Sequence, residues 1–193
     1  MRNRFFICLM LLASGTYGQD QPATLPLSNF TIKPAIGVLP WGLPVKALAA
    51  VLVEYPLKGN WVIGAHTMLA SAVAKNTYNI ETNYSLQGTQ KFGVGYTMTG
   101  PKKFVRLTLL AMGGVRYITF KETLDYPGLE KITTKTSTIL PDVGLLVDWS
   151  LGRKRHTFNA RIYLPFYPFD GYPVSTFQNI SVEMGLGIRL KHH

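Results

Sequence analysis

Histidines are the side chains of this sequence best suited to bond-making chemistry. Acyl transfer or hydrolysis needs a histidine beside a serine nucleophile, with an acid that orients the imidazole ring. The candidates are His66, His156, His192 and His193. His66 falls on the polar face of an expected strand and His156 belongs to a basic turn, so their positions do not predict catalytic residues.

The sequence also lacks the residues that a metal site, a reactive thiol or a nucleotide-binding loop would need. The only cysteine, Cys8, lies within an expected export signal, so the mature chain would have no disulfide and no cysteine-based site. Gly93-x-Gly95 and Gly185-x-Gly187 fall on expected strands with no helix after them, which argues against a phosphate-binding loop. The sequence therefore predicts no catalytic residue, no metal site and no cofactor.

The N-terminus resembles a signal for export. Arg2 and Arg4 precede an apolar run at residues 5–13, and small residues stand before a cleavage point after Gly18. An uncleaved anchor helix is the alternative, but the run is much shorter than the ~20 residues that span a bilayer. We expect residues 1–18 to be a signal peptide and residues 19–193 to form one domain.

The expected mature chain is organised as strands. Apolar and polar residues alternate in eight segments, and no convincing amphipathic helix is present. Ten residues of strand tilted by about 45° rise about 24 Å, which matches the apolar band of an outer-membrane barrel. Short and long links alternate, as an up-and-down barrel requires. The expected strands are residues 30–39, 45–57, 61–73, 88–99, 103–120, 135–150, 156–166 and 178–190, with long links at 74–87, 121–134 and 167–177.

The two faces of these strands differ in charge. One face is almost uncharged, whereas the other carries charges of both signs together with several glycines. Charges of both signs are expected inside a narrow closed barrel, where a buried charge needs a partner, and glycines relieve crowding there. A sheet with one solvated face is the plainer alternative. The expected lumen charges are Lys46, Glu54, Lys91, Arg106, Arg116, Asp142, Asp148, Arg161, Glu183 and Arg189.

Aromatic residues gather near the ends of the expected strands. Rings with one polar edge prefer the two interfaces of a membrane, whereas an ordinary core spreads them through mid-strand. The sequence therefore favours an all-β fold, an eight-stranded antiparallel up-and-down transmembrane β-barrel with short periplasmic turns and longer outer loops. The expected aromatic belts are Trp41, Tyr55, Trp61, Tyr117, Phe120, Trp149, Phe158 and Phe166.

Two stretches resemble a known family. Residues 54–64 (EYPLKGNWVIG) are similar to the strand–turn–strand units of small outer-membrane β-barrels of the OmpA/OmpX type, and residues 182–190 (VEMGLGIRL) resemble their last strand. The resemblance implies an eight-stranded barrel in the outer membrane of a Gram-negative cell envelope. Such barrels usually end on an aromatic residue, whereas this chain continues through Lys191, His192 and His193.

Several functions fit this expected barrel. Side chains fill the interior of eight strands, so a general porin is not expected. We expect a structural or surface-interaction protein, or an accessory subunit of an envelope complex. One alternative is a lipid-modifying barrel enzyme, although relatives that deacylate lipid A place serine two residues after the histidine, where this chain has Met68 and Phe158. The other is a soluble lipocalin-like carrier.

Membrane lipids are the expected partners. The chain carries a net charge of +10, and much of the excess falls at the short turns, where it suits anionic lipid headgroups, acidic periplasmic proteins or simple solubility. The long loops offer a surface for an envelope protein, or the outer aromatic belt. Nucleic acid is not expected, since an exported barrel would not meet it. The basic turn residues are Lys58, Lys102, Lys103, Arg153, Lys154, Arg155 and Lys191.

Overall fold

The computed structural model describes the strands and most of the turns of the expected barrel. The described residues are 30–40, 45–72, 76–77, 80–100, 104–124, 127–128, 130–152, 155–166 and 180–190. The expected signal peptide and Trp41 lie outside these residues, as do the aromatic residues of the 167–177 link.

The described chain is built of strands. In chain order they are β1 (Thr31–Leu39), β2 (Lys46–Pro56), β3 (Trp61–Ala72), β4 (Asn76–Thr77), β5 (Ile80–Thr99), β6 (Val105–Leu124), β7 (Ile132–Leu151), β8 (His156–Pro165) and β9 (Ser181–Arg189). Within the described part of the chain, no helix is long and apolar enough to cross a membrane.

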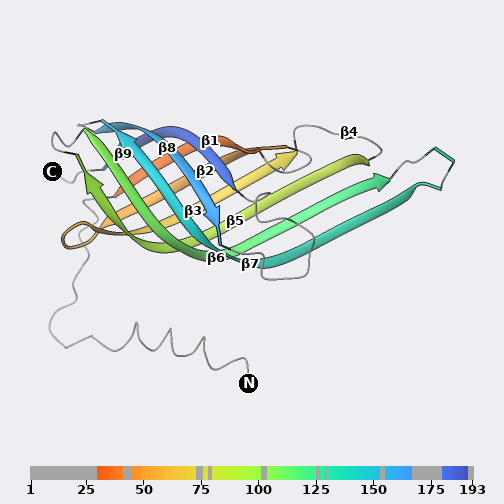
Figure 1. The fold of residues 1–193 in the computed structure, drawn as a ribbon, viewed down its shortest axis with the longest axis horizontal. Helices are drawn as coiled ribbons and strands as arrows, with labels where there is room; N and C mark the ends of the chain where they lie inside the picture. The colour runs from red at the N-terminus through yellow and green to blue at the C-terminus, as the bar shows by residue number, and fades with distance from the viewer. Residues whose placement is uncertain are drawn as a thin grey trace, which may run out of the picture.

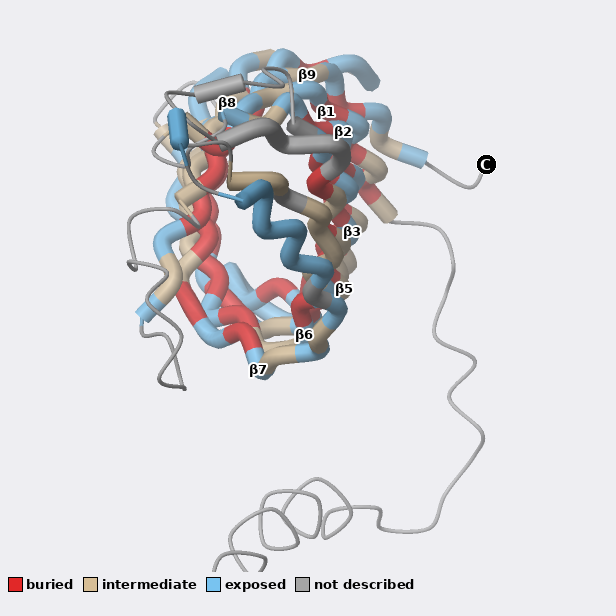
Figure 2. The backbone as a smooth tube through the Cα atoms, turned by 90° about the vertical axis from the view of Figure 1, so that its right-hand side faces the viewer, coloured by how far each residue is buried: buried red, intermediate tan, exposed pale blue. Residues whose placement is uncertain are grey.

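Eight of these strands close into a barrel. Each strand pairs antiparallel with its neighbours, β3 pairs with β5, and β1 pairs with β9 to close the ring. Among the described strands, the two-residue β4 pairs with β5 alone and is not counted among the eight. Figure 1 shows the strands running side by side, and Figure 2 shows the wall closing into a ring. The predicted eight-stranded antiparallel barrel is therefore confirmed.

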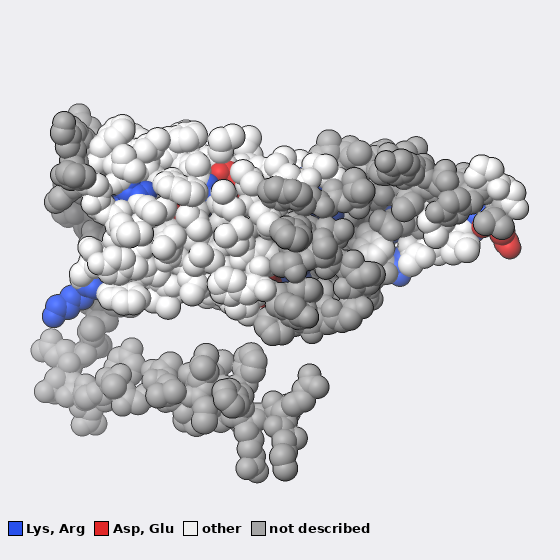
Figure 3. Space-filling model, viewed as in Figure 1, with Lys and Arg blue, Asp and Glu red and all other residues white. Residues whose placement is uncertain are grey.

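Alternating side chains give the wall two unlike faces. In β2 and β8, buried residues alternate with half-buried or exposed ones along the strand. Large apolar side chains point outward: Ile36 is 74% exposed, Leu69 is 55% exposed and Phe92 is 62% exposed. Charged side chains such as Lys33 and Asp148 are fully buried. The side of the barrel seen in Figure 3 is accordingly almost free of charged atoms.

Apolar side chains share the interior with the charges. One buried cluster consists of Leu52, Val62, Leu110, Met112, Leu146 and Tyr163. A second consists of Leu39, Leu48, Ala50, Met68 and Ala70. The interior is thus packed, as expected for a barrel of eight strands.

Three strands are longer than the sequence predicts. β5, β6 and β7 have 20 residues each and project as a three-stranded sheet beyond the barrel, which we call the tongue. The expected loops at 74–87 and 121–134 are therefore wrong in part, because residues 80–87, 121–124 and 132–134 are strand. Apolar alternation fails as a signal there because both faces of the tongue can meet water. The β-branched threonines of this region still favour extended structure.

Tight turns join the strands at the other end, which we call the short-turn end. Gly59 has φ of +74°, a left-handed conformation that suits glycine, and the amide of Leu57 donates to the carbonyl of Trp61 (2.8 Å) to close the β2–β3 turn. The amide of Gly100 likewise donates to the carbonyl of Val105 (2.9 Å). These links set the register of the strands that carry the interior charges.

Candidate functional site: ion pairs inside the barrel

Lys33 is the centre of one group of interior charges. Its Nζ lies 2.7 Å from Glu54 Oε2 on β2 and 2.7 Å from Asp148 Oδ2 on β7. It also donates to Ser150 Oγ (3.1 Å), which in turn donates to Asp148 (2.8 Å). The ammonium group therefore has three oxygen partners and the side chain has no exposure to solvent.

Glu183 on β9 extends this group across the barrel. Its carboxylate lies 3.1 Å from Arg161 Nε on β8 and 3.1 Å from His66 Nε2 on β3, and it accepts a hydrogen bond from Ser181 (2.9 Å). Arg161 Nε is also 4.0 Å from Asp148 Oδ1, which connects the two halves. We call the group formed by Lys33, Glu54, His66, Asp148, Arg161 and Glu183 the Lys33 cluster.

Asp142 on β7 anchors a second group. Arg116 on β6 approaches it to 2.8 Å, Lys91 on β5 to 3.3 Å, and Tyr163 Oη on β8 donates to it at 2.6 Å. Lys91 Nζ also sits 3.3 Å from the centre of the Tyr163 ring, a cation–π contact. We call these four residues the Asp142 cluster.

A glycine makes room for the tyrosine of the Asp142 cluster. A Cβ atom at Gly144 would lie 2.6 Å from Tyr163 Oη and would also meet the carbonyl oxygen of Leu164. Both approaches are closer than real Cβ atoms make. Gly144 therefore allows the Tyr163 ring to lie against the backbone of β7, with its hydroxyl directed at Asp142.

The structure brings most of the expected lumen charges together. Glu54, Asp148, Arg161 and Glu183 are in the Lys33 cluster, and Lys91, Arg116 and Asp142 are in the Asp142 cluster. Lys46 is half-buried and donates to Gln87 Oε1 (3.3 Å) outside both clusters. Arg106 and Arg189 also point inward, but they form no ion pair with any described residue.

Lys33 and Tyr163 are cluster members that the sequence analysis leaves out. Lys33 shares its face of β1 with Thr31 and alternates with Ile32 and Pro34, so alternation alone could have found it. The position of Tyr163 carries no such signal. A tyrosine on the inward face suits packing or hydrogen bonding equally well.

The described belt residues lie on the outward face except Phe120, which alternates in phase with Arg116 on β6 and so shares the inward face. Trp61, Tyr117, Trp149, Phe158 and Phe166 are exposed. Tyr55 and Phe120 are half-buried. The Trp61 ring meets Tyr96 edge-on at 5.6 Å, and Phe30 packs against Tyr55 at 5.1 Å.

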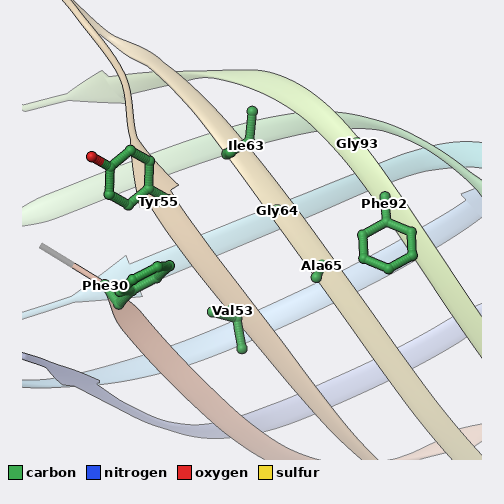
Figure 4. A pocket seen from close by; sticks show the side chains of 8 residues that line it. All are labelled: Phe30, Val53, Tyr55, Ile63, Gly64, Ala65, Phe92 and Gly93. Carbon is green, nitrogen blue, oxygen red and sulfur yellow. The ribbon is translucent and has the colours of Figure 1, made fainter. Parts of the chain in front are cut away.

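An apolar groove of about 350 Å³ lies on the outside of the wall, close to the short-turn end. Figure 4 shows its lining on Phe30 and the strands β2, β3 and β5, with three aromatic rings set around small residues. It would suit an apolar chain. The lining residues are Phe30, Val53, Tyr55, Ile63, Gly64, Ala65, Phe92 and Gly93.

The described histidines lie apart from one another. His66 is buried and its side-chain partner is Glu183, whereas His156 is exposed at the start of β8. His192 and His193 lie outside the described residues. Among the side chains that the structure describes, no group of histidine, cysteine, aspartate and glutamate could hold a metal ion. The site is therefore a set of buried ion pairs that connect the strands of the wall.

The chain is similar to known proteins in its fold. No family model matches the chain, and no curated protein matches it. The crystal structure of Ail, the attachment invasion locus protein of Yersinia pestis, matches with a TM-score of 0.50 at 12% identity, over 84% of this chain and 97% of Ail. Neisserial surface protein A (NspA) matches with a TM-score of 0.51 at 13% identity, over 85% of this chain and 96% of NspA. The chain therefore has the fold of the small eight-stranded outer-membrane β-barrels.

Proposed function

We propose that this chain spans an outer membrane and serves at the cell surface as an interaction protein. In this proposal the barrel anchors the chain in lipid, and the tongue binds an extended segment of a partner protein along the edge of β7. The names of the two similar structures, an attachment invasion locus protein and a surface protein, support a role at the surface. The edge of β7, which no described strand pairs along the tongue, is the observation that carries the binding role.

The inside-out wall supports the membrane part of the proposal. Val94 is 47% exposed and Leu186 is 63% exposed, while Arg161 and Glu183 are buried. Water would leave such an apolar surface prone to association, whereas lipid solvates it. A lipocalin-like carrier needs the reverse arrangement, with apolar residues around an internal cavity. The groove in Figure 4 also faces outward, where an acyl chain would reach it.

The packed interior supports an anchoring role over a general pore. Leu52, Leu110 and Leu146 are fully buried inside the barrel, beside the ion pairs of the Lys33 cluster. Side chains that fill the interior in this way leave no wide path for water. The enzyme alternative gains no support from His66, whose described side-chain partner is a carboxylate and not a serine.

No described strand pairs with the outer edge of β7 along the tongue. β7 pairs with β6 from Ile132 to Leu151, but with β8 only from Gly144 onward. The amide of Phe166 donates to the carbonyl of Val143, so the main-chain N–H and C=O of Val143 face the β8 side of the strand. Peptide groups alternate in direction along a strand. Along the tongue, the N–H and C=O groups that face this side belong to Thr133, Lys135, Ser137 and Ile139. No described strand pairs with them.

An extended polypeptide is the partner that such an edge fits. Adding a strand satisfies a row of main-chain donors and acceptors, a mode of recognition known as β-augmentation. Pro141 lacks an amide hydrogen and ends the row beside the barrel, and the polar threonines and Lys135 discourage unspecific pairing. Lys135 stands directly opposite Lys121 on β6. Two like charges across a strand pair favour a partner segment with acidic residues.

A proline at the edge tests the proposal. Ser137→Pro removes one main-chain donor on the open side, while the β6 side of the strand keeps its hydrogen bonds. Ser137→Ala is the matched control, because both variants lose the 3.0 Å hydrogen bond between the Ser137 and Tyr117 hydroxyls. A photo-crosslinking amino acid at the exposed Thr134 reports binding on intact cells, with the adduct identified by mass spectrometry.

The proposal expects an adduct with the same protein in wild type and in Ser137→Ala, and its loss in Ser137→Pro. Heat-dependent gel mobility checks that all three variants fold and insert. An adduct that survives Ser137→Pro unchanged would show that the edge is not used, and the binding role would then be abandoned.

A further inference from the structure

Two arginines at the short-turn end lack the partners that the other interior charges have. Arg106 stands at the start of β6 and Arg189 at the end of β9, both on the inward face and both half-buried. Nε and Nη2 of Arg106 and Nε of Arg189 are shielded from solvent and have no hydrogen-bond acceptor among the described residues. A guanidinium group stays charged in a protein, so each unpaired buried donor carries a penalty.

The charge balance identifies these two arginines as the surplus. Apart from Lys46, which stands at the opposite end of β2 from the short turns, the described interior holds six lysine and arginine side chains, Lys33, Lys91, Arg106, Arg116, Arg161 and Arg189, and four carboxylates, Glu54, Asp142, Asp148 and Glu183. Every one of the four carboxylates lies within 4.0 Å of a cation of the Lys33 or Asp142 cluster. The four carboxylates can balance four of these six cations, and the two left over are Arg106 and Arg189, which make no ion pair with a described residue.

The carboxylate that acts on Arg189 forms no ion pair with it. Glu54 interacts electrostatically with Arg189, but its Oε2 is held by Lys33 at 2.7 Å. Arg106 and Arg189 both stand on the inward face at the short-turn ends of their strands, and they act on each other as like charges. The repulsion between them would fall if an anion lay between them.

Polar groups complete the surroundings of the two arginines. Arg106 stands opposite Ser150 on β7, and Ser150 stands opposite Asn159 on β8. On the other side of the mouth, Arg189 stands opposite Thr31 on β1. Ser150, Asn159 and Thr31 are all buried. Each arginine thus has a buried hydroxyl-bearing residue as its partner on a neighbouring strand.

We infer that Arg106 and Arg189 form an oxyanion site of the phosphate class at the short-turn mouth of the barrel. Guanidinium forks match the oxygens of phosphate, and a doubly charged oxyanion would neutralise the two surplus charges. Both arginines remain partly exposed, so the anion would enter from the short-turn end. This inference goes beyond the proposed function, which concerns the tongue at the opposite end of the molecule.

Urea unfolding in phosphate and in chloride tests the site. The full chain without residues 1–18 is refolded in a non-ionic detergent, and inorganic phosphate is compared with sodium chloride at equal ionic strength. The variants are Arg106→Gln and Arg189→Gln. Lys58→Gln is the control, since it removes one positive charge from an exposed turn at the same end. Phosphate should raise the unfolding midpoint of wild type and of Lys58→Gln.

The apparent phosphate affinity should fall about tenfold or more in each arginine variant, because a charge-assisted hydrogen-bonding group is lost. In chloride, Arg106→Gln should unfold no more easily than wild type, because it removes a charge without a partner. A purely structural role for Arg106 predicts the opposite, a lower midpoint in chloride. Stabilisation by phosphate that is equally large in wild type and in all variants would overturn the site.

A second arm distinguishes the source of the phosphate group. The same chains are placed in nanodiscs of phosphatidylcholine with and without phosphatidylglycerol. Stabilisation by inorganic phosphate in detergent supports a soluble oxyanion, whereas stabilisation by phosphatidylglycerol alone that is lost in both arginine variants supports a lipid headgroup. Failure of wild type to respond to either probe would overturn the inference. The tongue experiment is independent of both outcomes.

Discussion

Lys33 on β1 and Asp148 on β7 form a buried ion pair of 2.7 Å although their strands are not neighbours in the sheet. β9 and β8 stand between them in the wall, so the contact crosses the interior. Glu54 on β2 joins the same ammonium group at 2.7 Å. The interior charges thus connect strands that backbone hydrogen bonds do not connect, which should make the barrel stiffer and its unfolding more cooperative.

Removing Lys33 should destabilise the barrel strongly. Lys33→Met leaves Glu54 and Asp148 buried without their shared cation, a loss of about 3–5 kcal/mol in the free energy of unfolding. Urea unfolding in detergent, followed by tryptophan fluorescence, measures the change. Adding Asp148→Asn to Lys33→Met should recover part of the loss, because one of the two unpaired charges is then gone.

Lys58→Met is the control for that experiment, since Lys58 is exposed in the β2–β3 turn and its loss should change stability by less than about 0.5 kcal/mol. An effect of Lys33→Met as small as this control would mean that the ion pairs contribute little to holding the wall together.

Two glycines of the barrel should respond differently to the same substitution. Gly144→Ala places a methyl group against Tyr163 and the backbone of Leu164, and should cost about 1–3 kcal/mol through overpacking. Gly113→Ala meets nothing within 4 Å and should be neutral or slightly stabilising. Parallel urea titrations compare the two. Equal costs at both positions would contradict the close packing of Tyr163 over β7.

The packed interior predicts a closed barrel. Purified protein in planar lipid bilayers should show no steady open conductance, because Leu52, Leu110 and Leu146 fill the interior beside the ion pairs. Single-channel recording at moderate voltage measures this. A stable conductance that depends on Arg116 or Lys91 would show instead that the charges line an ion path.

Much of this architecture could be predicted from alternation in the sequence. A barrel strand has one apolar and one polar face, so the alternation predicts that Glu54, Lys91, Arg116, Asp142, Asp148, Arg161 and Glu183 share the polar face. It could not say which charges pair. Lys33 meets Asp148 across the interior, and that distance depends on the closure and stagger of the whole ring.

The tongue escaped prediction for a different reason. Residues 80–87 and 132–134 belong to strands that have left the barrel, so neither face must be apolar, and the polar sequence resembles a loop. Tyr163 escaped because its role depends on Gly144 of a neighbouring strand, through contacts that one sequence does not display.

Outward-facing positions should differ in their tolerance of charge. Val94 lies partway along the barrel part of β5 and Ile132 at the far end of the tongue, and both are exposed. In a bilayer, Val94→Arg should cost about 2–4 kcal/mol, because the charge would meet hydrocarbon. Ile132→Arg should change stability by less than about 0.5 kcal/mol. Refolding titrations into lipid vesicles measure both, and equal small effects would contradict a lipid-facing wall.

Spin labels on the outward face test the central claim most directly. Single-cysteine variants Val94→Cys and Ile132→Cys, in a chain without residues 1–18 and therefore without Cys8, are labelled and placed in lipid nanodiscs. The account predicts that the label at position 94 collides with oxygen and is hidden from a water-soluble nickel chelate, while the label at position 132 shows the reverse. Free access of the nickel chelate to position 94 would contradict the account.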